Sequence, residues 1–290
     1  MREKVSVLAA SVLAFAFAFA LAFVSWSCAR ATPPPETAAA GERLAAANQI
    51  VGSLIGAPAA SADARVATFL YDEKKRVDIY WPPGFAFDRR VPLVLFVVSI
   101  ADSKVKRDIG SSAPDLAAYV SWCAAAACQG AAAACQGAAA AIMTVTEPAK
   151  DLEKLAMWLK KQAGALRLDM SKVYLWACSS NWTSSARLVA SGGPFEKEVA
   201  GISLYYAYVS VMTPSPAKDV PVEVVIPEKD NVAEMRTLAS YAERLKADGC
   251  AVRVIKIPGA SHSFDTRLDA PETRATVAGT LEAIRTNLGL

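Results

Sequence analysis

The chain has 290 residues, of which 53% are hydrophobic and 20% charged, so it can form one large domain or two small ones and is too apolar to be disordered. Its net charge of +3 is too small to indicate nucleic-acid binding, and we expect no nucleic-acid partner. His262 is the single histidine, which excludes a metal site with several histidine ligands. We expect neither a metal nor a cofactor.

The first 28 residues have the pattern of an export signal. Arg2 and Lys4 precede an apolar run over residues 5–24, and Cys28 follows shortly after it. This ending resembles a bacterial lipobox, which implies that Cys28 is lipidated and anchors the chain to a membrane. Cleavage after Ala-Arg-Ala at 29–31, giving a secreted protein, and an uncleaved membrane anchor are the alternatives. All three place the protein outside the cytoplasm, in the cell envelope or periplasm when it is lipid-anchored and otherwise secreted.

Residues 29–64 are rich in Pro and Ala and are predicted to be a tether, and residues 65–290 are predicted to form the folded domain. Within the domain, alternating or continuous apolar runs predict strands, and apolar residues at helical spacing predict helices. The predicted strands are 65–71, 76–81, 91–98, 141–146, 172–178, 200–206, 220–226 and 251–257. The predicted helices are 151–162, 180–190, 233–247 and 272–288. This alternation predicts an α/β fold, a mainly parallel sheet with helices on both faces.

One segment is repetitive. Residues 124–130 read AAAACQG, residues 131–137 repeat them, and residues 138–141 begin the pattern a third time. Alanine favours helix, so we interpret the segment as a tandem duplication within a helix that tolerates insertion. A functional repeat is the alternative.

The residues that carry chemistry follow three of the predicted strands. Residues 177–181 read Ala-Cys-Ser-Ser-Asn and join a strand to a helix, with Ser179 at the centre. Asp230 follows the strand 220–226, and His262 lies in Pro-Gly-Ala-Ser-His-Ser-Phe after the strand 251–257. A serine, an acid and a histidine are the groups of a nucleophile, an orienting carboxylate and a general base.

These stretches resemble the α/β-hydrolase family, whose nucleophile lies in a G-x-S-x-G elbow and whose acid and histidine follow in this order. The resemblance covers roughly residues 66–288. It implies an α/β-hydrolase-type sheet in which Ser179 is the nucleophile, His262 the base and Asp230 the orienting acid. It also implies that the Ser180 backbone N–H is one oxyanion donor.

The second oxyanion donor is expected at Ser99 or Ile100, in the loop after the strand 91–98. The chain departs from the family here, since Val98-Ser99 stands where the family has His-Gly, and Asn181 replaces the last glycine of the elbow. We interpret Asn181 as crowding the elbow and both residues as weakening oxyanion stabilisation, so we expect weak esterase activity that rises when glycine is restored at either position.

The resemblance implies an exported serine hydrolase that acts on a small-molecule or polymeric ester, and less directly on a peptide. A binding or scaffold lipoprotein that keeps the fold without catalysis is the main alternative, and a hydrolase that uses Cys178 is a further one. Each residue also has a purely structural interpretation: Ser179 and Asp230 as helix caps, and His262 as a loop histidine.

Overall fold

The computed structural model describes residues 54–56, 64–128 and 137–290. The predicted signal, the lipidation at Cys28 and most of the predicted tether lie outside these residues. Within the described ranges, no helix is both long and apolar enough to cross a bilayer.

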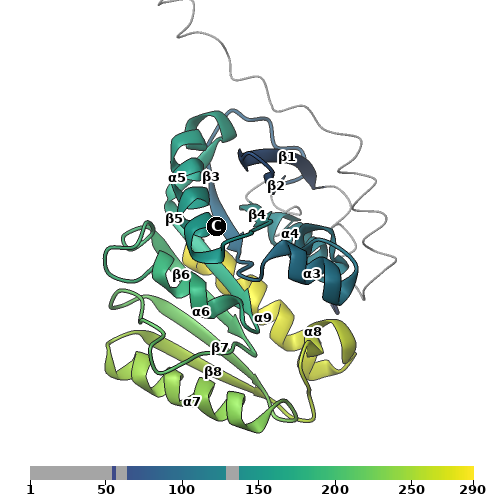
Figure 1. Ribbon diagram of the computed structural model, residues 1–290, viewed down its shortest axis with the longest axis vertical. Coiled ribbons are helices and arrows are strands. Elements are labelled where there is room, and N and C mark those ends of the chain that lie inside the picture. Colours follow the sequence, from purple (N-terminus) through teal and green to yellow (C-terminus); the bar gives the residue numbers. More distant parts are fainter. Residues whose placement is uncertain (1–53, 57–63, 129–136) are drawn as a thin grey trace, which may run out of the picture. The chain divides into compact units, whose positions relative to one another are not determined.

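The domain is built on an eight-stranded sheet with the order β1-β2-β4-β3-β5-β6-β7-β8 (Figure 1). β1 pairs with β2, and β2 with β4, in antiparallel fashion, whereas every other pairing is parallel. The predicted mainly parallel sheet is therefore confirmed. The strands are β1 (Arg65–Asp72), β2 (Lys75–Trp81), β3 (Val91–Phe96), β4 (Ala139–Met143), β5 (Leu168–Cys178), β6 (Val199–Tyr205), β7 (Pro221–Pro227) and β8 (Ala251–Ile257).

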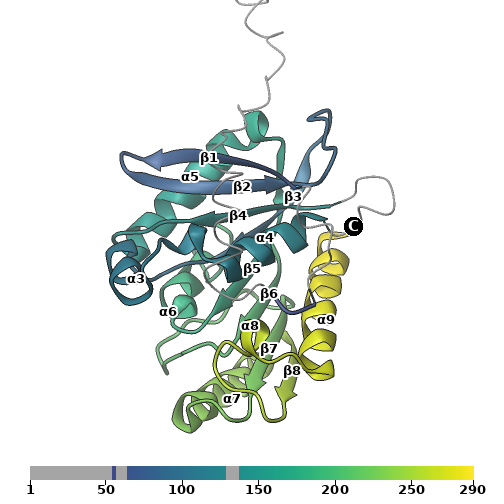
Figure 2. The same ribbon diagram turned by 90° about the vertical axis from the view of Figure 1, so that its right-hand side faces the viewer.

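Helices cover both faces of the sheet. Helices α4 and α9 pack on one face, and α5, α6 and α7 pack on the other (Figure 2). The helices are α3 (Asp102–Ile109), α4 (Ala117–Cys128), α5 (Pro148–Leu166), α6 (Asn181–Ser185), α7 (Val232–Ala247), α8 (Phe264–Arg267) and α9 (Pro271–Leu288), with short 3-10 turns η2 (Ala113–Asp115) and η3 (Ala186–Leu188).

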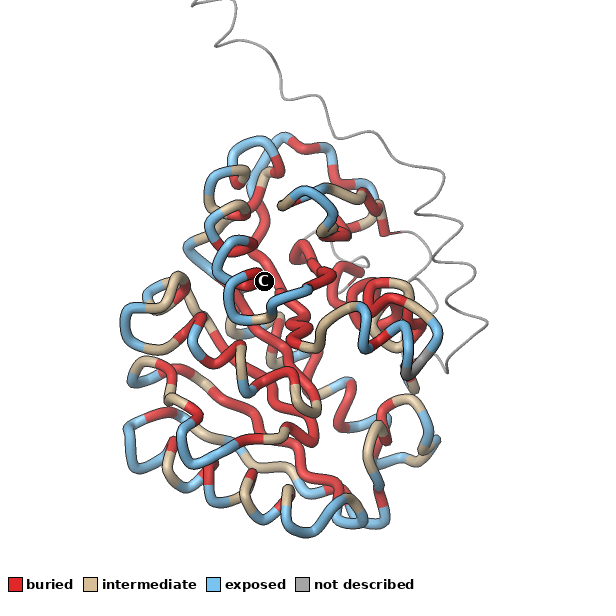
Figure 3. The backbone as a smooth tube through the Cα atoms, in the orientation of Figure 1, coloured by how far each residue is buried: buried red, intermediate tan, exposed pale blue. Residues whose placement is uncertain are grey.

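Burial follows the position of each strand in the sheet. Every residue of β3 and β4 is buried, as expected for central strands that are covered on both faces (Figure 3). The edge strand β8 is mostly part-exposed and carries Arg253 and Lys256, charges that discourage pairing with another chain.

The structure differs from the predicted elements in several places. The AAAACQG segment is not helical throughout: Ala124–Cys128 ends α4, whereas Ala139–Ala141 lies in β4, and residues 129–136 lie outside the described part. The strand predicted at 141–146 therefore begins at Ala139 and ends at Met143. The helix predicted at 180–190 is only the five-residue α6 followed by η3, because the chain tightens into a 3-10 turn at Ala186. Sequence patterns also did not indicate α3, most of α4, or α8.

Candidate active site

Ser179 occupies a sharp turn between β5 and α6. Its φ angle is +51°, a left-handed conformation that is unfavourable for a residue with a side chain. Two backbone hydrogen bonds hold the turn: the Ser179 N–H donates to Tyr205 O at 3.0 Å, and the Tyr208 N–H donates to Ser179 O at 2.7 Å. The end of β6 therefore fixes the strained turn that presents the Ser179 hydroxyl.

The structure brings the predicted serine, histidine and acid together. His262 Nε2 lies 3.0 Å from Ser179 Oγ, and His262 Nδ1 lies 2.7 Å from Asp230 Oδ2. The side chain of His262 is 33% exposed and that of Asp230 only 6%, so solvent reaches the histidine more easily than the acid. This is the geometry that a serine nucleophile, a base and an orienting acid require.

The alternative interpretation of Asp230 and Ser179 as helix caps does not match the structure. The cap of α7 is Asn231, whose side chain accepts hydrogen bonds from the N–H groups of Ala233 and Glu234. The residue at the N-terminus of α6 is Ser180, and no side-chain cap is formed there. Ser179 and Asp230 instead direct their side chains to His262.

Two tyrosines that follow β6 flank the histidine, and the sequence analysis did not identify them. The ring centroid of Tyr206 lies 4.5 Å from that of His262, and the ring centroid of Tyr208 lies 5.4 Å away. The signal that could have found them is their position: residues that directly follow a parallel strand lie at the same sheet edge as the ends of β5, β7 and β8.

The loop after β3 is joined to the elbow by two hydrogen bonds that Ser99 donates to Asn181. The Ser99 N–H donates to Asn181 Oδ1 at 2.9 Å, and Ser99 Oγ donates to Asn181 O at 2.8 Å. Asn181 Nδ2 donates to the hydroxyl of Tyr119 at 2.9 Å. The buried Asn181 side chain is therefore a connector with its amide satisfied at both ends, and it does not simply crowd the elbow.

These bonds narrow the choice of oxyanion donors. The Ser99 N–H is already occupied by Asn181, which removes one of the two candidates for the second donor. The N–H groups of Ser180 and Ile100 have no backbone acceptor within the described residues. Ser180 and Ile100 thus remain as the pair that is able to donate to a developing oxyanion.

Cys178 directly precedes Ser179 in the chain but is itself an unsuitable nucleophile. Its thiol is buried and lies 3.3 Å from the hydroxyl oxygen of Tyr119. Burial raises the pKa of the Cys178 thiol to about 12, so it stays protonated and unreactive at neutral pH. The alternative of a cysteine-based hydrolase is therefore disfavoured.

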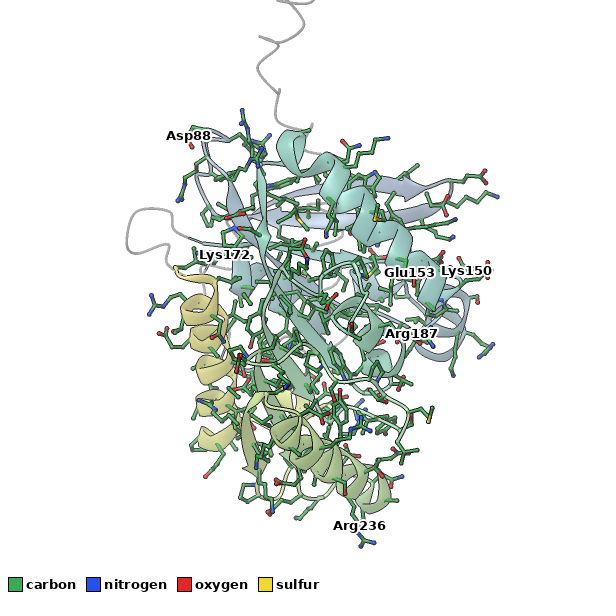
Figure 4. The ribbon with its side chains drawn as sticks, turned by 90° about the vertical axis from the view of Figure 1, so that its left-hand side faces the viewer. Asp88, Lys150, Glu153, Lys172, Arg187 and Arg236 are labelled. Atoms are coloured by element: carbon green, nitrogen blue, oxygen red, sulfur yellow. The ribbon has the colours of Figure 1, made fainter. Side chains whose placement is uncertain are left out.

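A surface groove of about 650 Å³ lies elsewhere, beside α5 and the turn after η3. Glu153 and Arg187, both labelled in Figure 4, line it together with Met157 and Met212, whose side chains are largely exposed. None of the three residues Ser179, Asp230 and His262 lines this groove, so its size is no guide to the site of chemistry.

No protein-family model and no curated protein sequence matches the chain. Among solved structures, a fungal esterase from Rhizomucor miehei is 15% identical and has a TM-score of 0.59, with 92% of this chain and 96% of that chain covered. A thermophilic carboxylesterase cloned from a metagenomic library is also 15% identical, with a TM-score of 0.60 and coverages of 86% and 95%. An esterase from Thermogutta terrifontis with butyrate bound is 13% identical, with a TM-score of 0.54 and coverages of 77% and 94%. At these identities the likeness shows a shared fold.

Proposed function

We propose, from the premise that this chain has the α/β-hydrolase fold, that it is an exported serine hydrolase that cleaves carboxylic esters. The observation that carries the proposal is the continuous hydrogen-bonded chain Ser179 Oγ–His262 Nε2 and His262 Nδ1–Asp230 Oδ2, with distances of 3.0 and 2.7 Å. A serine hydroxyl is a poor nucleophile unless a neighbouring base removes its proton. Here His262 is that base.

In the acylation step, Ser179 Oγ attacks the carbonyl carbon of the ester while His262 Nε2 takes the hydroxyl proton. Asp230 accepts the hydrogen bond from Nδ1, which keeps the ring in the required tautomer and stabilises the imidazolium. The Ser180 and Ile100 N–H groups donate to the oxyanion of the tetrahedral intermediate. When the carbon–oxygen bond of the ester breaks, His262 gives its proton to the departing alkoxide and an alcohol leaves.

In the deacylation step, a water molecule takes the place of the alcohol. His262 removes a proton from this water as its oxygen attacks the acyl carbon, and the same two N–H groups stabilise the second oxyanion. The bond to Ser179 Oγ then breaks, and His262 returns the proton to the serine. The products are a carboxylic acid and the free enzyme.

A small-molecule ester is the substrate class that the comparisons favour. The Thermogutta terrifontis esterase has been described with butyrate bound and also phosphonylated by sarin. By analogy, we expect short acyl esters to react with this chain and organophosphorus reagents to capture its nucleophile. A polymeric ester is the second candidate class, and peptides are a third.

We also propose that the protein acts outside the cytoplasm, held to a membrane through lipid on Cys28. The support is the sequence alone, in which basic residues, an apolar run and a lipobox-like ending precede the tether.

Covalent labelling tests the catalytic proposal. A fluorophosphonate probe should label the wild-type protein, and the label should map to Ser179 by peptide mass spectrometry. The S179A variant should lose labelling and hydrolysis of p-nitrophenyl acetate together. S180A is the matched control, because it removes the neighbouring hydroxyl and keeps the backbone N–H, so it should still be labelled.

The rival is a binding or scaffold protein with the same fold. It predicts that folded wild-type protein stays unlabelled and hydrolyses no ester. That outcome would replace the enzyme with the scaffold.

A further inference from the structure

A second acid interacts electrostatically with the histidine and takes no part in the steps above. Asp265 is in α8, three residues after His262, and only 1% of it is exposed. Its Oδ2 accepts a hydrogen bond from Trp122 Nε1, and its Oδ1 accepts one from the Tyr206 hydroxyl, both at 2.9 Å. Burying a carboxyl group in a protein core is unfavourable, so its presence here calls for a function.

Tyr206 connects this acid to the histidine. Its hydroxyl bonds to Asp265, and its ring lies against His262 with centroids 4.5 Å apart. Tyr206 also has a φ angle of +40°, an unfavourable backbone conformation that its surroundings must maintain. The bond to Asp265 and the backbone bond from the Tyr206 N–H to Val225 O are two contacts that hold it there.

The turn that carries the histidine is strained on its other side as well. Ser263, the next residue, has a φ angle of +59°. The two residues after it are both anchored, Phe264 by stacking on Tyr205 with centroids 5.8 Å apart and Asp265 by its two hydrogen bonds. The strained turn is therefore held by the start of α8, and Asp265 provides the polar part of that anchor.

In the described part of the chain, the ionisable side chains that the structure shows interacting with His262 and Asp265 are acids or uncharged groups. Asp230 faces His262 directly, and Asp265 interacts with it electrostatically. Burial raises the pKa values of the other ionisable side chains that face the two residues, so they remain uncharged at neutral pH; they are Tyr119, Cys178, Tyr205, Tyr206 and Tyr208. Burial also raises the pKa of Asp265, whereas the hydrogen bonds from Trp122 and Tyr206 and the neighbouring imidazole favour its charged form.

We propose that Asp265 is a positioning residue for His262: through Tyr206 it holds the histidine turn in place and, acting as a carboxylate that accepts one hydrogen bond at each oxygen, it stabilises the imidazolium that forms during the reaction. A charge acts strongly in a site shielded from water. The catalytic part of this role rests on the proposed function, whereas the effect on the proton affinity of the imidazole does not.

The test uses the fact that the chain has one histidine. In full-length protein prepared without a histidine tag, the imidazole resonances report the titration of His262 alone. Replacing the charge in D265N should make the imidazolium less favourable, so the titration midpoint should fall by roughly half a pH unit or more. Y206F, which keeps the ring and loses the hydroxyl, should move the midpoint in the same direction by less.

D269N is the matched control, since Asp269 is a nearby exposed acid paired with Arg274. The titration midpoint of His262 in D269N should equal that of wild type. An unchanged midpoint in D265N overturns the proposal. If D265N does not fold, Y206F provides the test. An unchanged titration midpoint of His262 in Y206F also overturns the proposal.

Ester turnover gives a second measurement that separates the two proposals. In an active enzyme, D265N should lower kcat about tenfold with little change in KM, and the acid limb of the kcat/KM profile should move with the midpoint. A wild-type protein that is neither labelled nor active refutes the proposed function, whereas the histidine titration still decides the role of Asp265.

Discussion

At the scale of single residues, Asn181 shows how a departure from a motif acquires a different meaning in the structure. From the sequence, the missing glycine indicates a crowded elbow that glycine would relieve. In the structure the side chain instead joins Ser99 to Tyr119. Motif comparison identifies the position, but the partners come from segments 82 and 62 residues away in the chain, so only the folded arrangement reveals them.

These contacts reverse the expected effect of glycine at residue 181. N181G removes the acceptor of the Ser99 N–H and the donor to Tyr119, which releases the loop that carries the Ile100 N–H. We expect kcat on p-nitrophenyl acetate to fall by about 10- to 100-fold, less than the loss typical of a deleted oxyanion donor. Fluorophosphonate labelling of Ser179 should fall less than turnover, because the serine–histidine pair is untouched.

S184A serves as the control, since Ser184 lies in the same helix and contributes no described hydrogen bond. A rise in kcat for N181G would instead support the original interpretation of Asn181 as an obstruction.

At the scale of elements, the alanine repeat shows a limit of local sequence patterns. Ala124–Ala127 and Ala138–Ala141 are identical four-residue runs, yet the first is in helix α4 and the second enters strand β4. Both runs are almost completely buried. The strand assignment depends on pairing with β2 on one side and β3 on the other, and such long-range pairing outweighs the intrinsic preference of alanine for helix.

The N-terminus of α5 offers a test of stability. Asp151 accepts hydrogen bonds from the N–H groups of Thr146 and Glu147 and pairs with Lys75 at 2.7 Å. Burial opposes its ionisation, but these three partners outweigh burial and lower the pKa of Asp151. D151N should therefore reduce the free energy of unfolding at pH 7 by about 2 kcal/mol.

The sign of the pH dependence follows from the lowered pKa. The contribution of Asp151 is fully present above the ordinary aspartate value of about 4 and is lost as the pH falls through the lower folded-state value. In urea unfolding, the difference between wild type and D151N should shrink as the pH falls below about 4. E153Q, an exposed change in the same helix, should leave the free energy of unfolding unaltered at pH 7 and below about pH 4. A difference that is constant with pH would exclude an ionic contribution from Asp151.

At the scale of the whole molecule, the arrangement of the three site residues is predictable because parallel strands share one carboxyl edge. Ser179, Asp230 and His262 each follow a predicted strand, so their convergence follows from the sheet. The pairing of Asp265 with Trp122 does not follow from it. That bond joins residues 143 positions apart and depends on the contact that the fold creates between α4 and α8.

The predicted lipid anchor also belongs to this scale. Expressed in a bacterium with its own N-terminus, the protein should partition into the detergent phase, and its mature N-terminal peptide should carry lipid on Cys28. The C28S variant should lose the lipid and move to the aqueous phase, because acyl chains contribute about 0.8 kcal/mol per buried methylene to membrane binding. A mature chain that begins at Thr32, or one that retains Met1, would exclude the lipoprotein.

The strand order has a further consequence for the way in which the site comes into existence during folding. Ser179 and His262 are 83 residues apart, and the strands β6, β7 and β8 must all pair before the two side chains meet. Contacts between distant segments form slowly, since the entropy of a long loop is lost before the contact is gained. Ser179 and His262 therefore come together only after these strands have paired, so the proposed hydrolase acquires its reactive serine late in folding.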